Sequence, residues 1–141
     1  PPLMTVRQLA RQGDVTVHVV RNYLRRGLLQ AARHTESGYQ LFSASELKRL
    51  RFIRTAQQLG FTLAGKDHPI VPVMLGDAQL AGRMAEELLK EGIYVIGFSF
   101  PVVPKGKARI RTQMSAAHTK EQIDRAVAAF AKVGRALGAI A

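Results

Sequence analysis

Apolar residues recur every three or four positions in three segments of the first half of the chain. Two of these segments lie within residues 5–26 and are separated by a glycine, which is typical of a helix, a tight turn and a second helix. The third segment follows Ser43 and ends at Gly60, so it predicts a longer helix. Two short strand-like runs before Ser43 flank Glu36-Ser37-Gly38, which predicts a hairpin turn.

The pattern changes at a turn-rich seam over residues 64–69. Beyond the seam, residues 93–100 are almost continuously apolar, which indicates a strand covered on both faces. Residues 108–115 alternate, and this places Arg109 and Arg111 together on the face opposite to the apolar one. The predicted order is strand, helix, strand, strand and helix, at residues 70–75, 77–91, 93–100, 108–115 and 119–137. The whole pattern predicts an α+β fold, in which a mainly α unit precedes a mostly antiparallel sheet of three strands.

Several side chains predict how the helices begin and how they are stabilised. Asp77 is an N-cap candidate, and Glu121 with Arg125 has the i, i+4 spacing of a favourable ion pair. The capping-box pattern of Thr or Ser followed three positions later by Gln or Glu occurs at Thr5–Gln8, Ser43–Glu46 and Thr119–Gln122.

Charge and composition narrow the classes of function. The 141 residues carry a net charge of +11, of which residues 1–64 hold +7 with nine Arg and one Lys. Arg binds phosphate with a planar fork, so this half suits nucleic acid; the alternative is a merely soluble basic surface. The chain has no cysteine, which excludes disulfides, cysteine metal sites and cysteine nucleophiles. It also has no membrane-length apolar run and no N-terminal signal core, so we expect a cytoplasmic protein without a membrane partner.

The stretch TVRQLARQGDVTVHVVRNYLRRGLL, with its continuation ARHTESGYQLFSASELKRLRFIRTAQQLGFTL, resembles the DNA-binding domain of MerR-family transcription regulators. The resemblance covers about residues 4–63. It implies a winged helix-turn-helix whose second helix enters the major groove of double-stranded DNA while the wing follows the backbone. The residues that it implies face bases or phosphates are Thr16, His18, Arg21, Tyr23, Arg33 and Tyr39.

The residues themselves leave alternatives at two of these positions. Tyr23 lies on the apolar face of the second predicted helix, so it fits a core position as well as a phosphate contact. His18 fits a solvated surface position as well as a base contact. Clustered Arg and a capped helix N-terminus are nevertheless what phosphate binding needs.

Residues 67–141, from DHPIVPVMLGD through EGIYVIGFSFPVVPKGKARIRTQMSAAHT to the end, resemble a different family. They are similar to the C-terminal small domain of glycine C-acetyltransferase, also called 2-amino-3-ketobutyrate coenzyme A ligase, a pyridoxal-phosphate-dependent homodimer of the α-oxoamine synthase group. The resemblance implies that Arg111 binds the carboxylate of the amino-acid substrate. A solvated polar strand face is the alternative for Arg111.

Each half lacks parts that its resemblance would require. The large domain with the Schiff-base lysine and the phosphate cradle of such enzymes is not in this sequence, so we expect no cofactor unless a large domain completes the site. The MerR-like half stops at Phe61-Thr62-Leu63, where a fourth helix would begin. We therefore expect two units, residues 1–64 and 65–141, joined as a natural or engineered chimera.

The leading hypothesis is a DNA-binding transcription regulator of MerR type, with double-stranded DNA as partner and homodimerisation left open. The alternatives are a fragment of glycine C-acetyltransferase that is inactive alone, and a chimera without activity. Enzymatic activity of the isolated chain is uncertain, and we predict no catalytic residue and no metal site.

Overall fold

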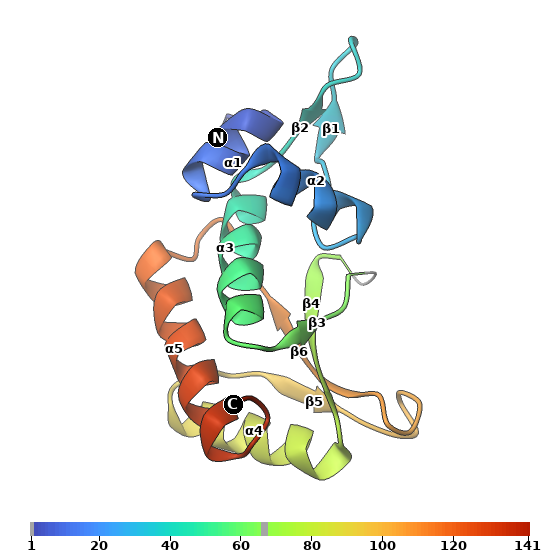
Figure 1. Cartoon of the computed structure of the whole chain (residues 1–141), viewed down its shortest axis with the longest axis vertical. Helices are drawn as coiled ribbons and strands as arrows, with labels where there is room; N and C mark the ends of the chain where they lie inside the picture. Colours follow the sequence, from blue (N-terminus) through green and yellow to red (C-terminus); the bar gives the residue numbers. More distant parts are fainter. Residues whose placement is uncertain (1, 66–67) are drawn as a thin grey trace.

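The computed structural model describes residues 2–65 and 68–141. Two short helices and a β-hairpin form one end of the molecule, a central helix follows, and a sheet with two helices forms the rest (Figure 1). The elements are α1 (Val6–Gln12), α2 (Val17–Arg25), β1 (Arg33–His34), β2 (Gln40–Leu41), α3 (Ala44–Gln58), β3 (Thr62–Leu63), β4 (Ile70–Gly76), α4 (Ala78–Lys90), β5 (Ile96–Phe98), β6 (Ala108–Gln113) and α5 (Lys120–Ala136).

The three N-terminal helices and the hairpin confirm the helical spacing and turn signals of the sequence. At the start of α1, the amide of Gln8 donates to Thr5 Oγ1 at 3.2 Å, and the amide of Thr5 donates to Gln8 Oε1 at 2.8 Å. This is the predicted capping box, in which each residue satisfies a free amide of the other. The hairpin β1–β2 is antiparallel and turns at Gly38, whose φ of +86° is a conformation that glycine adopts without strain.

The sheet contains four strands among the described residues, in the order β3-β4-β6-β5, and every pairing is antiparallel. Three of these strands were predicted, whereas β3 is a fourth strand, at the residues where the MerR-like half was expected to stop. The predicted sheet of three strands was therefore one strand short, because Leu63 pairs with Val73 of β4, and its side chain is buried in the sheet.

Strand β5 was predicted to be covered on both faces, and the structure does not confirm this prediction. Only Ile96–Phe98 pairs with β6, and β5 is the edge of the sheet. Tyr94 is 76% exposed and Ile96 is 49% exposed, and Phe100 is exposed as well. The prediction was wrong because a continuous apolar run does not show what covers it: α4 packs on β5, and Ile93 and Val95 are partly buried, whereas Tyr94, Ile96 and Phe100 remain exposed.

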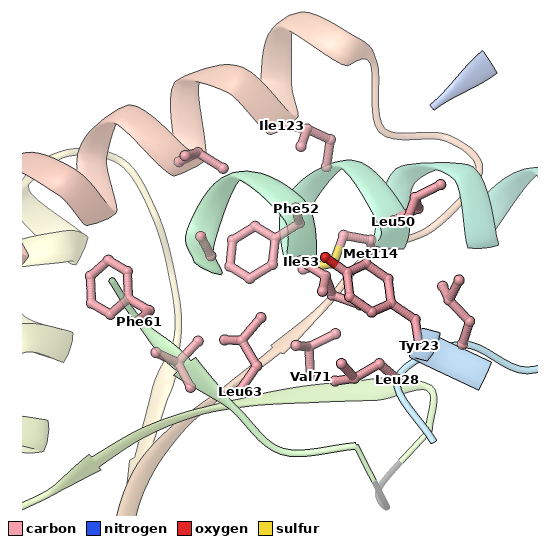
Figure 2. Close-up of a cluster of buried hydrophobic side chains, with 14 of the residues drawn as sticks. Tyr23, Leu28, Leu50, Phe52, Ile53, Phe61, Leu63, Val71, Met114 and Ile123 are labelled. Carbon is pink, nitrogen blue, oxygen red and sulfur yellow. The ribbon is translucent and has the colours of Figure 1, made fainter. Parts of the chain in front are cut away.

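Helix α3 is buried on two sides, which joins the N-terminal helices to the sheet. The hydrophobic cluster in Figure 2 runs from Tyr23 and Leu28, at the end of α2, past α3 to Phe61 and the sheet. On the side of α5, the ring of Phe130 makes edge-to-face contacts with Phe52 of α3 at 5.5 Å and with Phe61 at 5.8 Å. Edge-to-face geometry is the favourable arrangement of two aromatic rings.

Two predicted side-chain interactions are absent from the described residues, and a third is present. Ser43 begins α3 without a side-chain cap bond, and its hydroxyl lies 2.8 Å from that of Ser45; the side chain of Glu46 accepts from the amide of Gln30 and does not return to Ser43. Glu121 does not pair with Arg125; the ion pair on α5 is Lys120–Asp124, at 3.1 Å. The capping box of Thr119 with Gln122 forms as predicted.

Candidate functional site

The second helix of the helix-turn-helix presents a short polar face. Thr16 caps α2 by accepting a hydrogen bond from the amide of Val19 at 3.2 Å, which leaves its hydroxyl hydrogen free to donate. His18 and Arg21 follow on the exposed surface of α2. The opposite face is buried through Val20 and Tyr23. The N-terminal end of α2 therefore offers free amides and a cation to an anionic partner.

A groove of about 600 Å³ lies where α1, α2 and the hairpin meet. Arg21 from α2 and Tyr39 from the hairpin, two of the predicted DNA residues, line it together. Arg7 of α1, Gln40 and Thr5 also line it. Arg7 was not among the residues predicted to contact DNA, although a basic residue in the first turn of α1 is a candidate for binding phosphate. No acidic residue lines this groove, so its charge is positive.

The hairpin carries the remaining predicted surface residues. Arg33 is exposed on β1, where it pairs across the hairpin with Leu41. Tyr39 is 71% exposed, and its amide donates to Thr35 Oγ1 at 3.0 Å, which fixes the turn beside it. An exposed aromatic ring and an Arg on a rigid hairpin are suited to contact a sugar–phosphate backbone.

Tyr23 is the one predicted DNA residue that the structure places in the core. It is 5% exposed, and its hydroxyl donates to Gln57 Oε1 of α3 at 2.9 Å. Its ring packs in the cluster of Figure 2. Tyr23 thus links α2 to α3, as the core alternative required.

A buried polar cluster supports the exit from α2. Arg49 of α3 is 2% exposed and donates through Nε to the carbonyl of Leu28 and through Nη1 to the carbonyl of Pro69. Burial lowers the pKa of Arg49 from its ordinary value, and the nearby charge of Glu46 opposes this effect. Glu46 Oε1 lies 2.7 Å from His68 Nε2, and Glu46 Oε2 accepts from the amide of Gln30 at 3.0 Å. The cluster therefore ties α3 both to the helix-turn-helix and to the turn that leads into β4.

Arg111 lies in the other half of the molecule, on β6. Its guanidinium lies 4.0 Å from the ring centroid of Phe98 on β5, a cation–π contact, and its Nε has no hydrogen-bond partner among the described residues. Figure 1 shows β5 far from the hairpin β1–β2, so Arg111 and the predicted DNA residues form two separate sites.

The N-terminal elements match a family of regulators. A family model for "MerR HTH family regulatory protein" matches residues 4–66. The helix-turn-helix, the hairpin and α3 all fall inside this match, which supports the prediction of a DNA-binding regulator and confirms the resemblance of the first half.

The rest of the chain is similar to a particular enzyme. The 2-amino-3-ketobutyrate coenzyme A ligase of Escherichia coli (strain K12) is 59% identical over 106 residues, which are 75% of this chain and 27% of that protein. The mitochondrial ligase of Homo sapiens is 62% identical over 93 residues, 66% of this chain and 22% of that protein. A solved structure of SPT with a PLP internal aldimine has a TM-score of 0.59 and 31% identity, and covers 69% of this chain and 26% of that one. The chain thus spans about a quarter of the length of these relatives.

The two matches overlap in the middle of the chain. A match over 106 of 141 residues begins no later than residue 36, so it shares α3 and β3 with the match to the regulator family. The two matches together support a joined composition, and α3 lies within both of them.

The described residues around Arg111 offer no lysine that could hold the cofactor of the solved relative. Lys90, Lys120 and Lys132 are engaged by carboxylates on the surface. Residues 2–65 and 68–141 also contain no cluster of three His, Asp or Glu side chains that would hold a metal ion. No helix within these ranges has the length and apolar character to cross a membrane.

Proposed function

We propose that this chain binds double-stranded DNA as a regulator of the MerR type. The observation that carries the proposal is the acid-free groove in which Arg7, Arg21 and Tyr39, from three different elements, converge beside the capped end of α2. In this proposal, α2 enters the major groove with Thr16, His18 and Arg21 toward the bases and phosphates, and Arg33 and Tyr39 of the hairpin follow the backbone. Tyr23 acts behind α2 and positions it, and the protein works in the cytoplasm.

The test is selection of duplexes from a random-sequence library by the full chain, followed by fluorescence anisotropy with the selected duplex and with a scrambled one. We expect the selected duplex to bind at least a hundredfold more tightly, since specific sites exceed non-specific ones by about a thousandfold or more. An inverted repeat in the selected duplexes would indicate that two copies bind together, because half-site symmetry mirrors protein symmetry. Selection that enriches no sequence, together with equal affinity for scrambled DNA, would contradict a regulator.

A second proposal concerns the half that is similar to the ligase. The exposed side chains of Tyr94, Ile96 and Phe100 lie in a segment whose relatives have about three quarters of their chain outside the matched region. We propose that residues 65–141 are a partial fragment of this enzyme type, inactive alone, in which Arg111 binds a substrate carboxylate only when a large domain completes the site. An absorbance scan with pyridoxal phosphate and an assay with glycine and acetyl-coenzyme A test this proposal; turnover with one specifically trapped lysine would contradict it.

A further inference from the structure

The four-stranded sheet has two unlike faces. On one of them, Gly97 of β5 lies against α4, where a Cβ atom would come within 3.4 Å of the carbonyl oxygen of Ala81. Because successive side chains of a strand point to opposite faces, Phe98 lies on the face away from α4. The register continues this face across the sheet in a row that consists of Phe98, Arg109, Met74 and Thr62, none of them buried. We call this row, together with the residues that flank β5 at 94 and 99–107, the β5 surface.

Two aromatic rings of the β5 surface are exposed to solvent. Tyr94, before the strand, is 76% exposed, and Phe100, after it, is 58% exposed. They flank β5 at opposite ends, so they offer two separate apolar planes. The ring of Phe98 is half-buried and lies 4.0 Å from the guanidinium of Arg111. Exposed rings of this kind are stacking surfaces for nucleobases, since every base has a π-face.

The chain around β5 is basic over a long stretch. Residues 92–120 hold three Lys and two Arg and contain no Asp or Glu. Lys105 Nζ lies 5.1 Å from the ring centroid of Phe100. Arg109 Nε donates to the carbonyl of Lys107 at 3.0 Å. In the part of the chain that the structure describes, no ion pair involves these three cations, so their charge is available to a phosphate.

One carboxylate lies near these cations. Gly76 is close to the β5–β6 loop, since a Cβ atom there would come within 3.6 Å of the carbonyl oxygen of Gly106, and Asp77 follows it. The Asp77 side chain caps α4 by accepting from a backbone amide at 2.9 Å. Of the two acids that flank the basic stretch, Glu91 is engaged in an ion pair with α5, and Glu121 lies in the first turn of α5, far from the β5–β6 loop in Figure 1. The loop therefore keeps a surplus of positive charge.

We propose that the β5 surface binds single-stranded nucleic acid. Tyr94 and Phe100 stack on unpaired bases, while Lys105, Lys107 and Arg109 bind the phosphates. A duplex is not a ligand of this surface, because its bases are already stacked on one another and hide their faces. The positions also favour nucleic acid over a lipid surface, since the two rings flank a strand at opposite ends and do not form one continuous apolar face.

The proposed site is independent of the other two proposals. It lies far from the hairpin β1–β2 in Figure 1, so it goes beyond duplex binding by the helix-turn-helix. It assigns no role to Arg111. A large domain seated on Tyr94 and Phe100 would compete with the nucleic acid, so the site belongs to the chain by itself.

The test is fluorescence anisotropy of the full chain at low salt with a labelled oligothymidine of about 15 nucleotides, within the usual site size of about 4–16. We expect saturable binding. The double variant Tyr94→Ala with Phe100→Ala should weaken it at least tenfold, because loss of one stacked base costs about five- to a hundredfold in affinity. The matched control is Tyr39→Ala, which removes a ring that is 71% exposed on the hairpin and should change the affinity less than twofold. Thermal melting by circular dichroism checks that the variants are folded.

Two further probes separate the bases from the phosphates and from the duplex. An abasic strand of the same length should bind more weakly, and the double variant should not change its affinity. The duplex selected for the helix-turn-helix should bind the double variant as tightly as it binds the unchanged chain. Failure of the duplex selection and failure of this site are therefore distinct results.

Three results would overturn the proposal. One is the absence of saturable binding of oligothymidine by the folded full chain at low salt. Another is an equal loss of affinity in the double variant and in Tyr39→Ala, which would show that no ring of the β5 surface is specifically used. The last is binding to phosphatidylglycerol vesicles that depends on Tyr94 and Phe100 while binding of oligothymidine does not, which would assign the surface to lipid.

Discussion

At the scale of single residues, Arg21 is the side chain on which recognition by α2 depends most directly. It lies both on the exposed face of α2 and in the groove shared with the hairpin. A base contact or a bidentate phosphate contact is worth roughly 1–3 kcal/mol. We therefore predict that Arg21→Ala weakens DNA binding five- to a hundredfold in fluorescence anisotropy.

The matched control for Arg21 is Arg135→Ala, which removes the same charge from an exposed position on α5. Its effect should stay below twofold. An equal loss of DNA affinity in the two variants would show that binding is a diffuse attraction between charges. It would contradict a specific role of the groove in DNA binding.

Arg49 is the residue whose loss should be most costly to stability among the arginines of α3. Arg49→Met leaves the carbonyls of Leu28 and Pro69 without their donor and removes the cation near Glu46. Buried groups that lose their partners cost roughly 1–3 kcal/mol each, so we predict a loss of about 3 kcal/mol in the free energy of unfolding, measured with urea.

Arg51→Met is the comparison for this prediction. Arg51 donates to the carbonyl of Gln12 at 3.2 Å from an exposed position, where water replaces the bond. Its loss should cost less than about 1 kcal/mol. A neutral effect of Arg49→Met would mean that apolar packing replaces the buried guanidinium without penalty.

At the scale of elements, α3 carries contacts to both ends of the molecule, and Phe52 is central to them. Its side chain is fully buried and meets Phe130 of α5 edge to face. Truncation of a buried Phe costs roughly 3–5 kcal/mol. We predict a loss of this size for Phe52→Ala in urea denaturation, against less than about 0.5 kcal/mol for Leu89→Ala, whose side chain is 57% exposed. A loss below 1 kcal/mol for Phe52→Ala would contradict a tight junction between α3 and α5.

The elements that the sequence predicted well are those with local signals. The capping boxes of Thr5 and Thr119, the two helices of the helix-turn-helix and the alternation on β6 depend on neighbours a few positions away. Strand β3 has two residues and no such signal, because its pairing with β4 is set by the tertiary fold. The inward turn of Glu46 has the same origin, since its partners Gln30 and His68 are distant in sequence.

The candidate DNA site was predictable to a similar extent. The helical spacing placed Arg21 on the outward face of its helix from the sequence alone, and the MerR resemblance implied the position of Arg33; both are exposed. Tyr23 stayed ambiguous, because an amphipathic ring on an apolar helix face suits both the core and a phosphate, and only the bond to Gln57 distinguishes the two. Arg7 and Tyr39 line the same groove because the hairpin packs beside α1. This packing is tertiary, so no spacing between residues in the sequence predicts it.

At the scale of the whole molecule, the +7 carried by residues 1–64 predicts how DNA binding responds to salt. Bound cations release counterions from DNA, and neutralisation of about six phosphates gives a slope of log K against log salt near −5. We predict this slope for the selected duplex in anisotropy titrations across a range of potassium chloride concentrations. A slope near zero would mean that the contacts are not electrostatic.

Helix α3 packs against both the helix-turn-helix and the C-terminal elements, so we expect the two ends of the molecule to unfold together. A chain cut after residue 65 would keep the helix-turn-helix and lose α5 and three strands, and would expose Phe52, Phe61 and Leu63. We predict that this fragment is unfolded by circular dichroism at 25 °C, although it contains almost all of the match to the regulator family. A cooperatively melting fragment would contradict the prediction.

In native-state hydrogen exchange of the full chain, the slowest amides of α2 and of β6 should then share one opening free energy, because α3 cannot detach from one side without losing its packing on the other. The two regions with different relatives would thus unfold as one unit. Any ligand of either end would then protect the amides of both.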